Sequence, residues 1–216
     1  LVERGGTLRR DWLKALAEEI AEARARGQQV VVVSSGAIAL GAARLGLTAG
    51  GRANLADAQA AAAVGQIELA GAWAELLGQQ GLVAAQLLLT LDDLEDRRRY
   101  LNASSTLARL LDQGAVPVVN ENDSVATAEI RFGDNDRLAA RVAQAAGADA
   151  VVLLSDVDGL FDRDPKDPAA ELVREVGGID ERVRAMAGAS SGSGMGSGGM
   201  VSKLQAAEIA GRAGIA

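Results

Sequence analysis

Apolar residues near the start of the chain follow the spacing of an amphipathic helix. They recur at intervals of three and four residues, which places them on one face of an α-helix. These positions are Leu13, Leu16, Ala17 and Ile20. The helix is expected to begin between Thr7 and Asp11 and to end at Gly27, a residue type that commonly stops helices.

Four later runs are apolar without alternation, as expected of strands that are buried on both faces of a parallel sheet. They cover residues 29–34, 82–89, 115–119 and 150–154. Helical stretches are predicted between and after them, and several end at a glycine. These helices cover residues 37–45, 54–77, 101–112, 135–146 and 200–211. Residues 124–132 alternate in part, which predicts a short strand or hairpin.

The alternating order of strands and helices predicts an α/β fold, a three-layer αβα sandwich with a mainly parallel central sheet. In such folds, ligands bind beyond the carboxyl ends of the strands. The chain has 216 residues, of which 49% are apolar, so we expect one large domain over residues 1–216. The residues that follow the strands are therefore the candidates for a site.

Composition restricts the possible chemistry. The formal net charge of −7 disfavours nucleic acid as a partner. The sequence has no Cys and no His, so catalysis would depend on carboxylates, amides, Lys, Arg, Ser and backbone groups. No apolar run of about 18 residues is uninterrupted, so neither a membrane span nor a membrane partner is predicted, and a cytoplasmic location is expected.

A glycine-rich tract precedes the last predicted helix. Residues 188–199 are almost entirely Gly, Ser, Ala and Met, and Lys203 falls in the first turn of the helix. Backbone amides at a helix N-terminus bind phosphate, and a lysine there can offset charge on a transferred phosphoryl group. The tract is not a Walker A sequence, and its G-x-G-x-x-G match lacks the preceding strand of a dinucleotide site. A flexible linker is the alternative.

Carboxylates and amides gather at two further places. Residues 120–123, Asn-Glu-Asn-Asp, directly follow a predicted strand, and residues 133–136, Gly-Asp-Asn-Asp, open a predicted helix. Such groups could hold an ammonium group, a hydrated magnesium ion or a catalytic lysine. Asn135 and Asp136 could equally be ordinary helix caps. The presence of both clusters favours a binding function.

Two serine-containing turns follow predicted strands. Ser35 lies between the strand at 29–34 and the helix at 37–45, where small residues let backbone amides approach an anion. Ser155 and Asp156 follow the strand at 150–154, at the edge where α/β sheets contact nucleotides. Plain turns are the alternative for both. The charged residues 92–99 are interpreted as a solvated, ion-paired helix face without chemistry.

Taken in order, these motifs resemble the glutamate 5-kinases of the amino-acid kinase family. The matching segments are residues 33–38, 63–66, 100–103, 120–123, 133–136, 155–160 and 198–203. Together they cover nearly the whole chain, and their order and spacing make the resemblance specific. The resemblance implies the amino-acid kinase fold and ATP-dependent phosphorylation of the γ-carboxylate of L-glutamate, the first step of proline biosynthesis.

The resemblance also implies roles for individual residues. Ser35, Asp123 and Asn135 would hold L-glutamate, and Asp136 would organise the catalytic Lys203. ATP, carried with Mg²⁺, would contact Ser155, Asp156, Ser197, Gly198, Gly199, Met200, Val201, Ser202 and Lys203. No protein ligand for a metal is predicted. The attacking carboxylate is already ionised at neutral pH, so no general base is needed, and positioning and charge neutralisation supply catalysis.

The sequence departs from the family pattern at its ends. The family begins with a strand whose lysine and glycine contact phosphates, whereas this sequence begins at Leu1 and ends at Ala216. The RNA-modification-type domain found in many bacterial members has no counterpart here. We therefore expect a domain truncated at both ends, with little or no kinase activity by itself.

Two alternatives stay open. The chain could be another family member, acting on acetylglutamate, aspartate or a nucleotide monophosphate, or it could be a non-catalytic module that binds glutamate or proline. The resemblance further implies proline as a feedback inhibitor at the glutamate site. A homo-oligomer is expected, and apolar positions of the helix at 54–77 could serve either subunit contact or sheet packing.

Overall fold

The computed structural model describes residues 1–3, 5–125, 134–189 and 199–216. The chain divides into two compact units, Leu1–Ile130 and Arg131–Ala216, and each is described by itself. The expectation of one domain over residues 1–216 stays a prediction. Within the described residues, no helix is both long enough and apolar enough to cross a membrane.

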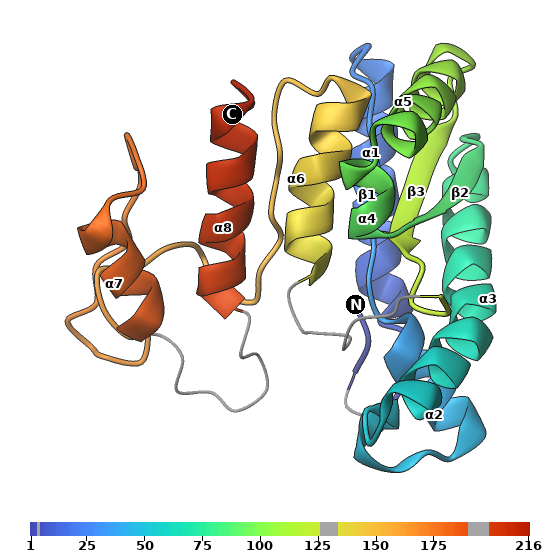
Figure 1. Cartoon of the computed structure of the whole chain (residues 1–216), viewed down its shortest axis with the longest axis horizontal. Helices are drawn as coiled ribbons and strands as arrows, with labels where there is room; N and C mark the ends of the chain where they lie inside the picture. Colours follow the sequence, from blue (N-terminus) through green and yellow to red (C-terminus); the bar gives the residue numbers. More distant parts are fainter. Residues whose placement is uncertain (4, 126–133, 190–198) are drawn as a thin grey trace. The chain divides into compact units, whose positions relative to one another are not determined.

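The first unit is built on a parallel sheet with strand order β1-β3-β2 (Figure 1). The strands are β1 (Val32–Val33), β2 (Ala84–Leu89) and β3 (Val116–Glu121). In the ladder, Val33 is in register with Val119, and Gln86 with Val118. Their carboxyl ends therefore share one edge of the sheet. Three of the four predicted strands are thus present, although β1 is shorter than its apolar run.

Helices cover this sheet. They are α1 (Arg10–Ala25), α2 (Ala37–Leu45), the 3₁₀ helix η1 (Thr48–Gly51), α3 (Leu55–Gln79), α4 (Leu91–Glu95) and α5 (Arg97–Asp112). The predicted helices agree with α1, α2, α3 and α5 to within a few residues. In the first unit, the short α4 and η1 have no counterpart among the predicted helices. The fold-class prediction, an α/β fold whose parallel sheet is flanked by helices, is confirmed.

The core of the first unit lies between the sheet and the pair α1 and α3. Val116 and Val118 of β3 pack there with buried side chains from both helices. The helix residues are Leu13, Ala17 and Ile20 of α1 and Leu69, Ala72, Trp73, Leu76 and Leu77 of α3. Because side chains alternate along a strand, Val119 faces the other way, on the side where α5 contacts β3. The scarcity of aromatic residues suits this close aliphatic packing.

Helices α2 and α3 cross at a contact that only glycine permits. A Cβ atom on Gly41 would lie 1.8 Å from the carbonyl oxygen of Ala61, and one on Gly65 would lie 1.8 Å from the carbonyl oxygen of Ala37. The two backbones therefore touch directly. This contact fixes the N-terminal turn of α2, which is separated from β1 by three residues, against the middle of α3.

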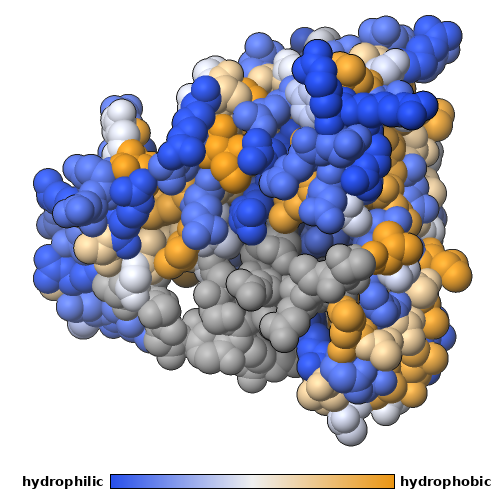
Figure 2. All heavy atoms as spheres, viewed as in Figure 1, coloured by the Kyte–Doolittle hydropathy of each residue, from blue (hydrophilic) through white to orange (hydrophobic). Residues whose placement is uncertain are grey.

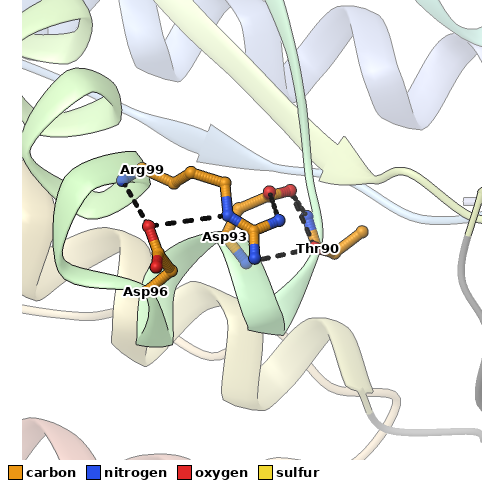
Figure 3. Close-up of polar contacts among 4 residues, drawn as sticks. All are labelled: Thr90, Asp93, Asp96 and Arg99. Carbon is orange, nitrogen blue, oxygen red and sulfur yellow. Dashed lines mark hydrogen bonds and ion pairs between the residues drawn. The ribbon is translucent and has the colours of Figure 1, made fainter.

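Polar residues fix the helix ends that follow β2. Thr90 and Asp93 form a reciprocal capping box at the start of α4, and Asp96 caps α5 by accepting from the Arg99 amide at 2.9 Å (Figure 3). The Arg99 guanidinium also donates to Asp93 at 2.9 Å. The surface over α4 and α5 is largely hydrophilic (Figure 2). The charged run interpreted as an ion-paired face therefore also caps two helices.

The described part of the second unit contains three helices and a long segment, residues 147–180, without regular helix or strand. The helices are α6 (Asp134–Ala146), α7 (Glu181–Ala189) and α8 (Gly199–Arg212). Alanines on α6 and α8 form a buried cluster together with Ile215, and Val151 and Leu153 pack against it. The predicted helices at 135–146 and 200–211 correspond to α6 and α8. Helix α7 had not been predicted.

The strand predicted at 150–154 is not formed. The segment alternates as a strand would, with Val151 and Leu153 packed on the cluster and Val152 80% exposed. Among the described residues, its backbone pairs only with Ala216: the Val151 amide donates to the Ala216 carbonyl, and the Ala216 amide donates to the Asp149 carbonyl. Two hydrogen bonds to a single residue do not make a ladder. The predicted hairpin at 124–132 lies largely outside the described residues.

Candidate functional site

Ser35 lies at the carboxyl edge of the sheet, between β1 and α2. The Ser34 amide donates to the Val119 carbonyl at 2.8 Å, which carries the β1–β3 ladder up to this turn. Ser34 is buried and Ser35 is exposed. Gly36 has a φ of 108°, in the region that favours glycine, and it lets the chain turn directly into α2. The serine predicted to hold a substrate is therefore accessible beside a helix N-terminus.

Asn120 is the penultimate residue of β3, at the same edge of the sheet. Its side chain is only 2% exposed, and its amide nitrogen donates to Oε1 of Gln66 in α3 at 2.7 Å. Its buried carbonyl oxygen has no hydrogen-bond partner among the residues that the structure describes. An unpaired buried acceptor is costly. Asn120 is therefore suited to accept a hydrogen bond from a bound ligand.

Asp123 is the last residue of the acidic loop, residues 120–123, and 8% of its surface is exposed. Arg52, after η1, lies close enough for the two charges to interact. Desolvation lowers the pKa of the Arg52 guanidinium, and the negative charge of Asp123 opposes that shift by raising the pKa. Arginine stays protonated at neutral pH in either case. The first unit thus combines a hydroxyl, an amide and a carboxylate at one sheet edge, with a cation beside the carboxylate.

Lys203 and Asp136 meet in the second unit. The Lys203 ammonium donates to Oδ1 of Asp136 at 3.0 Å, and the Ser202 hydroxyl donates to Oδ2 at 2.6 Å. The side chains of Lys203 and Asp136 are 18% and 21% exposed. Asp136 belongs to the first turn of α6, whereas Ser202 and Lys203 belong to the first turns of α8. Both oxygens of one carboxylate therefore hold the residues that open α8.

The N-terminus of α8 directly follows the glycine-rich tract. Gly199 begins the helix and is exposed, Met200 is partly exposed, and Val201 is exposed. Ser197 and Gly198, both predicted to contact ATP, lie outside the described residues. The N-terminal amides of a helix lack partners within the helix and favour an anion. The tract is thus followed by a helix end, Gly199, of the kind that binds phosphate.

The remaining predicted site residues within the described part of the chain are Ser155, Asp156 and Asn135. Ser155 and Asp156 are exposed in a bend, where Ser155 Oγ accepts from the Val157 amide at 3.5 Å. Among the described residues, no hydrogen bond or ion pair joins either of them to Lys203. Asn135 lies beside Asp136 in α6, and its buried side-chain oxygen has no hydrogen-bond partner among the described residues. The structure therefore joins Asp136, Ser202 and Lys203, and leaves an acceptor available on Asn135.

Comparison of the sequence with known proteins shows the family of the chain. The family model described as amino acid kinase family matches residues 2–216. The chain belongs to the amino-acid kinase family. It is 68% identical over 216 residues to a protein named glutamate 5-kinase from Novosphingobium aromaticivorans. It is 66% identical over 214 residues to one from Sphingopyxis alaskensis, and 62% identical over 216 residues to one from Zymomonas mobilis, both with the same name.

The matches cover the whole chain but only part of each relative. Between 99% and 100% of this chain is aligned in these three comparisons. The aligned part is 57% of the Novosphingobium protein, 58% of the Sphingopyxis protein and 54% of the Zymomonas protein. The chain thus spans little more than half the length of these members of the amino-acid kinase family.

Three residues at the sheet edge had no role assigned from sequence. Arg52 interacts electrostatically with Asp123, Gln66 binds Asn120, and the indole nitrogen of Trp73 donates to Ser34 Oγ at 3.0 Å. Gln66 lies in one of the segments that carry the family resemblance, which was a signal of importance without an indication of role. The contacts of Trp73 and Arg52 join residues far apart in the chain, and no local pattern shows them.

Proposed function

We propose that the protein phosphorylates the γ-carboxylate of L-glutamate with ATP. In this reaction a carboxylate oxygen forms a bond to the γ-phosphorus of ATP while the bond from that phosphorus to the bridging oxygen of ADP breaks. The products are γ-glutamyl phosphate and ADP. The arrangement of Lys203, Ser202 and Asp136 carries this proposal, together with the similarity to proteins named glutamate 5-kinase.

The second unit supplies the groups that suit a phosphoryl group. In the transition state of transfer, a phosphoryl group spreads negative charge over its oxygens, and a positioned cation stabilises that charge. Lys203 is such a cation, held by Asp136. The amide groups at Gly199 and the turn after it point along the α8 dipole, which also favours phosphate. Asp136 is therefore assigned to orientation of the lysine rather than to proton transfer.

The first unit supplies the groups that suit an amino acid. The exposed hydroxyl of Ser35 and the start of α2 favour a carboxylate. The carboxylate of Asp123 and the unpaired oxygen of Asn120 favour an ammonium group. Ser35 and Asp123 are accordingly assigned to L-glutamate, and Asn135, which belongs to the second unit, is assigned to it from the family resemblance. This assignment rests on the chemistry of the residues and on the family resemblance.

Magnesium fits this account as a companion of the nucleotide. Among the residues the structure describes, no three carboxylates gather closely enough to hold a metal ion. A Mg²⁺ ion bound to ATP would neutralise phosphate charge, and Ser155, Asp156 and residues 197–203 are assigned to ATP. Location in the cytoplasm, feedback inhibition by proline and homo-oligomeric assembly stay predictions.

The test uses a chimaera in which this chain replaces the aligned 57% of the Novosphingobium protein. ADP release is measured with glutamate, aspartate, N-acetylglutamate and a nucleotide monophosphate as acceptors. Glutamate is expected to be the preferred acceptor by kcat/KM. A folded chimaera that prefers another acceptor, or that releases no ADP above the rate of ATP hydrolysis alone, would contradict the proposal.

A further inference from the structure

One face of α3 makes hydrogen bonds to two segments at the carboxyl edge of the sheet. They are the serine turn, residues 34–36, and the acidic loop, residues 120–123. Trp73 donates its indole N–H to Ser34 Oγ at 3.0 Å, and Gln66 accepts from Asn120 Nδ2 at 2.7 Å. The two helix residues are seven positions apart, so they lie on the same side of α3, about 10 Å apart along its axis. One rigid helix therefore holds residues on both β1 and β3.

The Trp73–Ser34 hydrogen bond is buried, and the Asn120–Gln66 hydrogen bond is partly buried. Trp73 is 1% exposed, Ser34 3% and Asn120 2%. Breaking such a bond leaves a buried polar group without a partner, so the arrangement is strongly preferred over alternatives in which either turn moves. Gln66 is half-buried.

A third contact ties α3 to the serine turn. Gly65, next to Gln66, lies against the carbonyl of Ala37, the first residue of α2. Ser35 is thus held from both sides, through Ser34 and through the start of α2. Asp123 follows three residues after Asn120, at the far end of the second turn. The spacing between the serine turn and the acidic loop is set by α3 together with the β1–β3 ladder, in which the Ser34 amide donates to the Val119 carbonyl.

We propose that Trp73 and Gln66 are positioning residues for the amino-acid substrate: they fix Ser35 and Asp123 at the separation that the substrate requires. The inference rests on the proposed function, in which those two residues hold glutamate. Neither Trp73 nor Gln66 touches the substrate in this account. Their effect is expected on glutamate rather than on ATP, since Lys203 and the α8 N-terminus belong to the other unit.

The test compares Trp73→Phe and Gln66→Leu in the same chimaera. Both substitutions keep most of the side-chain volume and remove the hydrogen bond. We expect the KM for glutamate to rise about tenfold in each, the change that loss of one hydrogen bond typically produces. The KM for MgATP should stay within about twofold, since no ATP-binding group is altered. Ser34→Ala combined with Trp73→Phe should be no worse than either alone, because both remove the same bond.

A variant on the same helix separates positioning from stability. Leu76→Ala removes a buried side chain of α3 that packs in the core. It should lower Tm at least as much as Trp73→Phe while leaving the glutamate KM unchanged. Because Gln66 is only half-buried, Gln66→Leu keeps the test valid even if Trp73→Phe does not fold.

The outcomes are distinguishable. A selective rise in glutamate KM, absent in Leu76→Ala, supports the inference. An unchanged glutamate KM, or an equal rise for glutamate and MgATP, overturns it while leaving the proposed function intact. A folded wild-type chimaera that phosphorylates no glutamate overturns the proposed function, and this inference with it.

Discussion

The ammonium group of Lys203 lies 3.0 Å from Oδ1 of Asp136, an ion pair that joins the first turns of α8 and α6. The pair is mostly buried, and the second oxygen of Asp136 is taken by Ser202 at 2.6 Å. A lysine held in this way loses much of its conformational freedom before a substrate arrives. Positioning of this kind is what phosphoryl transfer needs when no general base takes part.

Substitution of Lys203 by methionine should remove the cation and keep most of the side-chain volume. In the chimaera with the Novosphingobium protein, we expect kcat to fall by about 10²-fold to 10³-fold, as for loss of one preorganised donor to transition-state charge. The KM for glutamate should change little. Lys14→Met, at an exposed position of α1, is the matched control and should keep full activity. A Lys203→Met enzyme with normal kcat would rule out this role.

Asp136→Asn tests whether the carboxylate positions the lysine. The amide keeps the shape of the side chain but loses the charge that holds the Lys203 ammonium. We expect kcat to fall on the order of 10²-fold, because a displaced cation no longer meets the developing charge. Glutamate affinity, measured by isothermal titration, should be unchanged. Loss of glutamate binding with kcat preserved would assign Asp136 to the substrate instead.

Two glycines of α3 should respond in opposite ways to alanine. Gly65→Ala places a methyl group 1.8 Å from the Ala37 carbonyl oxygen, so α2 and α3 must separate. We expect destabilisation of about 3 kcal/mol, at the upper end of overpacking effects. Gly71 has open space around its Cβ position, and Gly71→Ala should stabilise the helix by about 0.5–1 kcal/mol. Denaturant unfolding measures both, and equal effects would contradict the close crossing.

Asp93 should contribute stability in a pH-dependent way. Burial raises its pKa, but hydrogen bonds from the Thr90 amide and hydroxyl and the charge and hydrogen bond of Arg99 outweigh burial, so the pKa is lowered (Figure 3). A lowered pKa stabilises the fold above the unfolded pKa of about 3.9, and this stability is lost as pH falls through the folded pKa.

The variant Asp93→Asn should therefore be less stable at pH 7, by about 0.5–2 kcal/mol, as expected for a damaged cap. The difference from the wild type should shrink as the pH falls below about 4. Asp92→Asn, at the exposed neighbouring position, is the control and should show no such dependence. A stability difference that stays constant from pH 7 to pH 3 would contradict the charge-based account.

Local sequence patterns predicted most of the helices and strands, because these elements depend largely on the spacing of apolar residues and on the residues that stop a helix. The helix at 37–45 coincides with α2, whose apolar face and terminal Gly46 are read directly from the chain. The strand at 150–154 was wrong because a strand also needs neighbours, and its apolar run carries no information about them. Helix α7 was missed because its short sequence, with Arg182 and Arg184 among small residues, has a weak apolar face.

Residues of the candidate site could be predicted from sequence where a charged residue lies in the first turns of a predicted helix. Asp136 and Lys203 each open a helix, and the family resemblance linked them before the structure showed their contact. Trp73 and Gln66 could not be found in this way, because α3 is apolar over much of its surface and their partners lie 39 and 54 residues away. Such contacts depend on how the helix is packed, and that is fixed only by the complete fold.

The most direct measurement of the central claim is the identity of the product. The chimaera is incubated with glutamate, MgATP and hydroxylamine, which converts an acyl phosphate to a stable hydroxamate that mass spectrometry identifies. We predict γ-glutamyl hydroxamate in amounts equal to the ADP formed, and its loss in the Lys203→Met variant. ADP formation by a folded chimaera without any glutamyl hydroxamate, or equal hydroxamate formation with and without Lys203, would contradict the account.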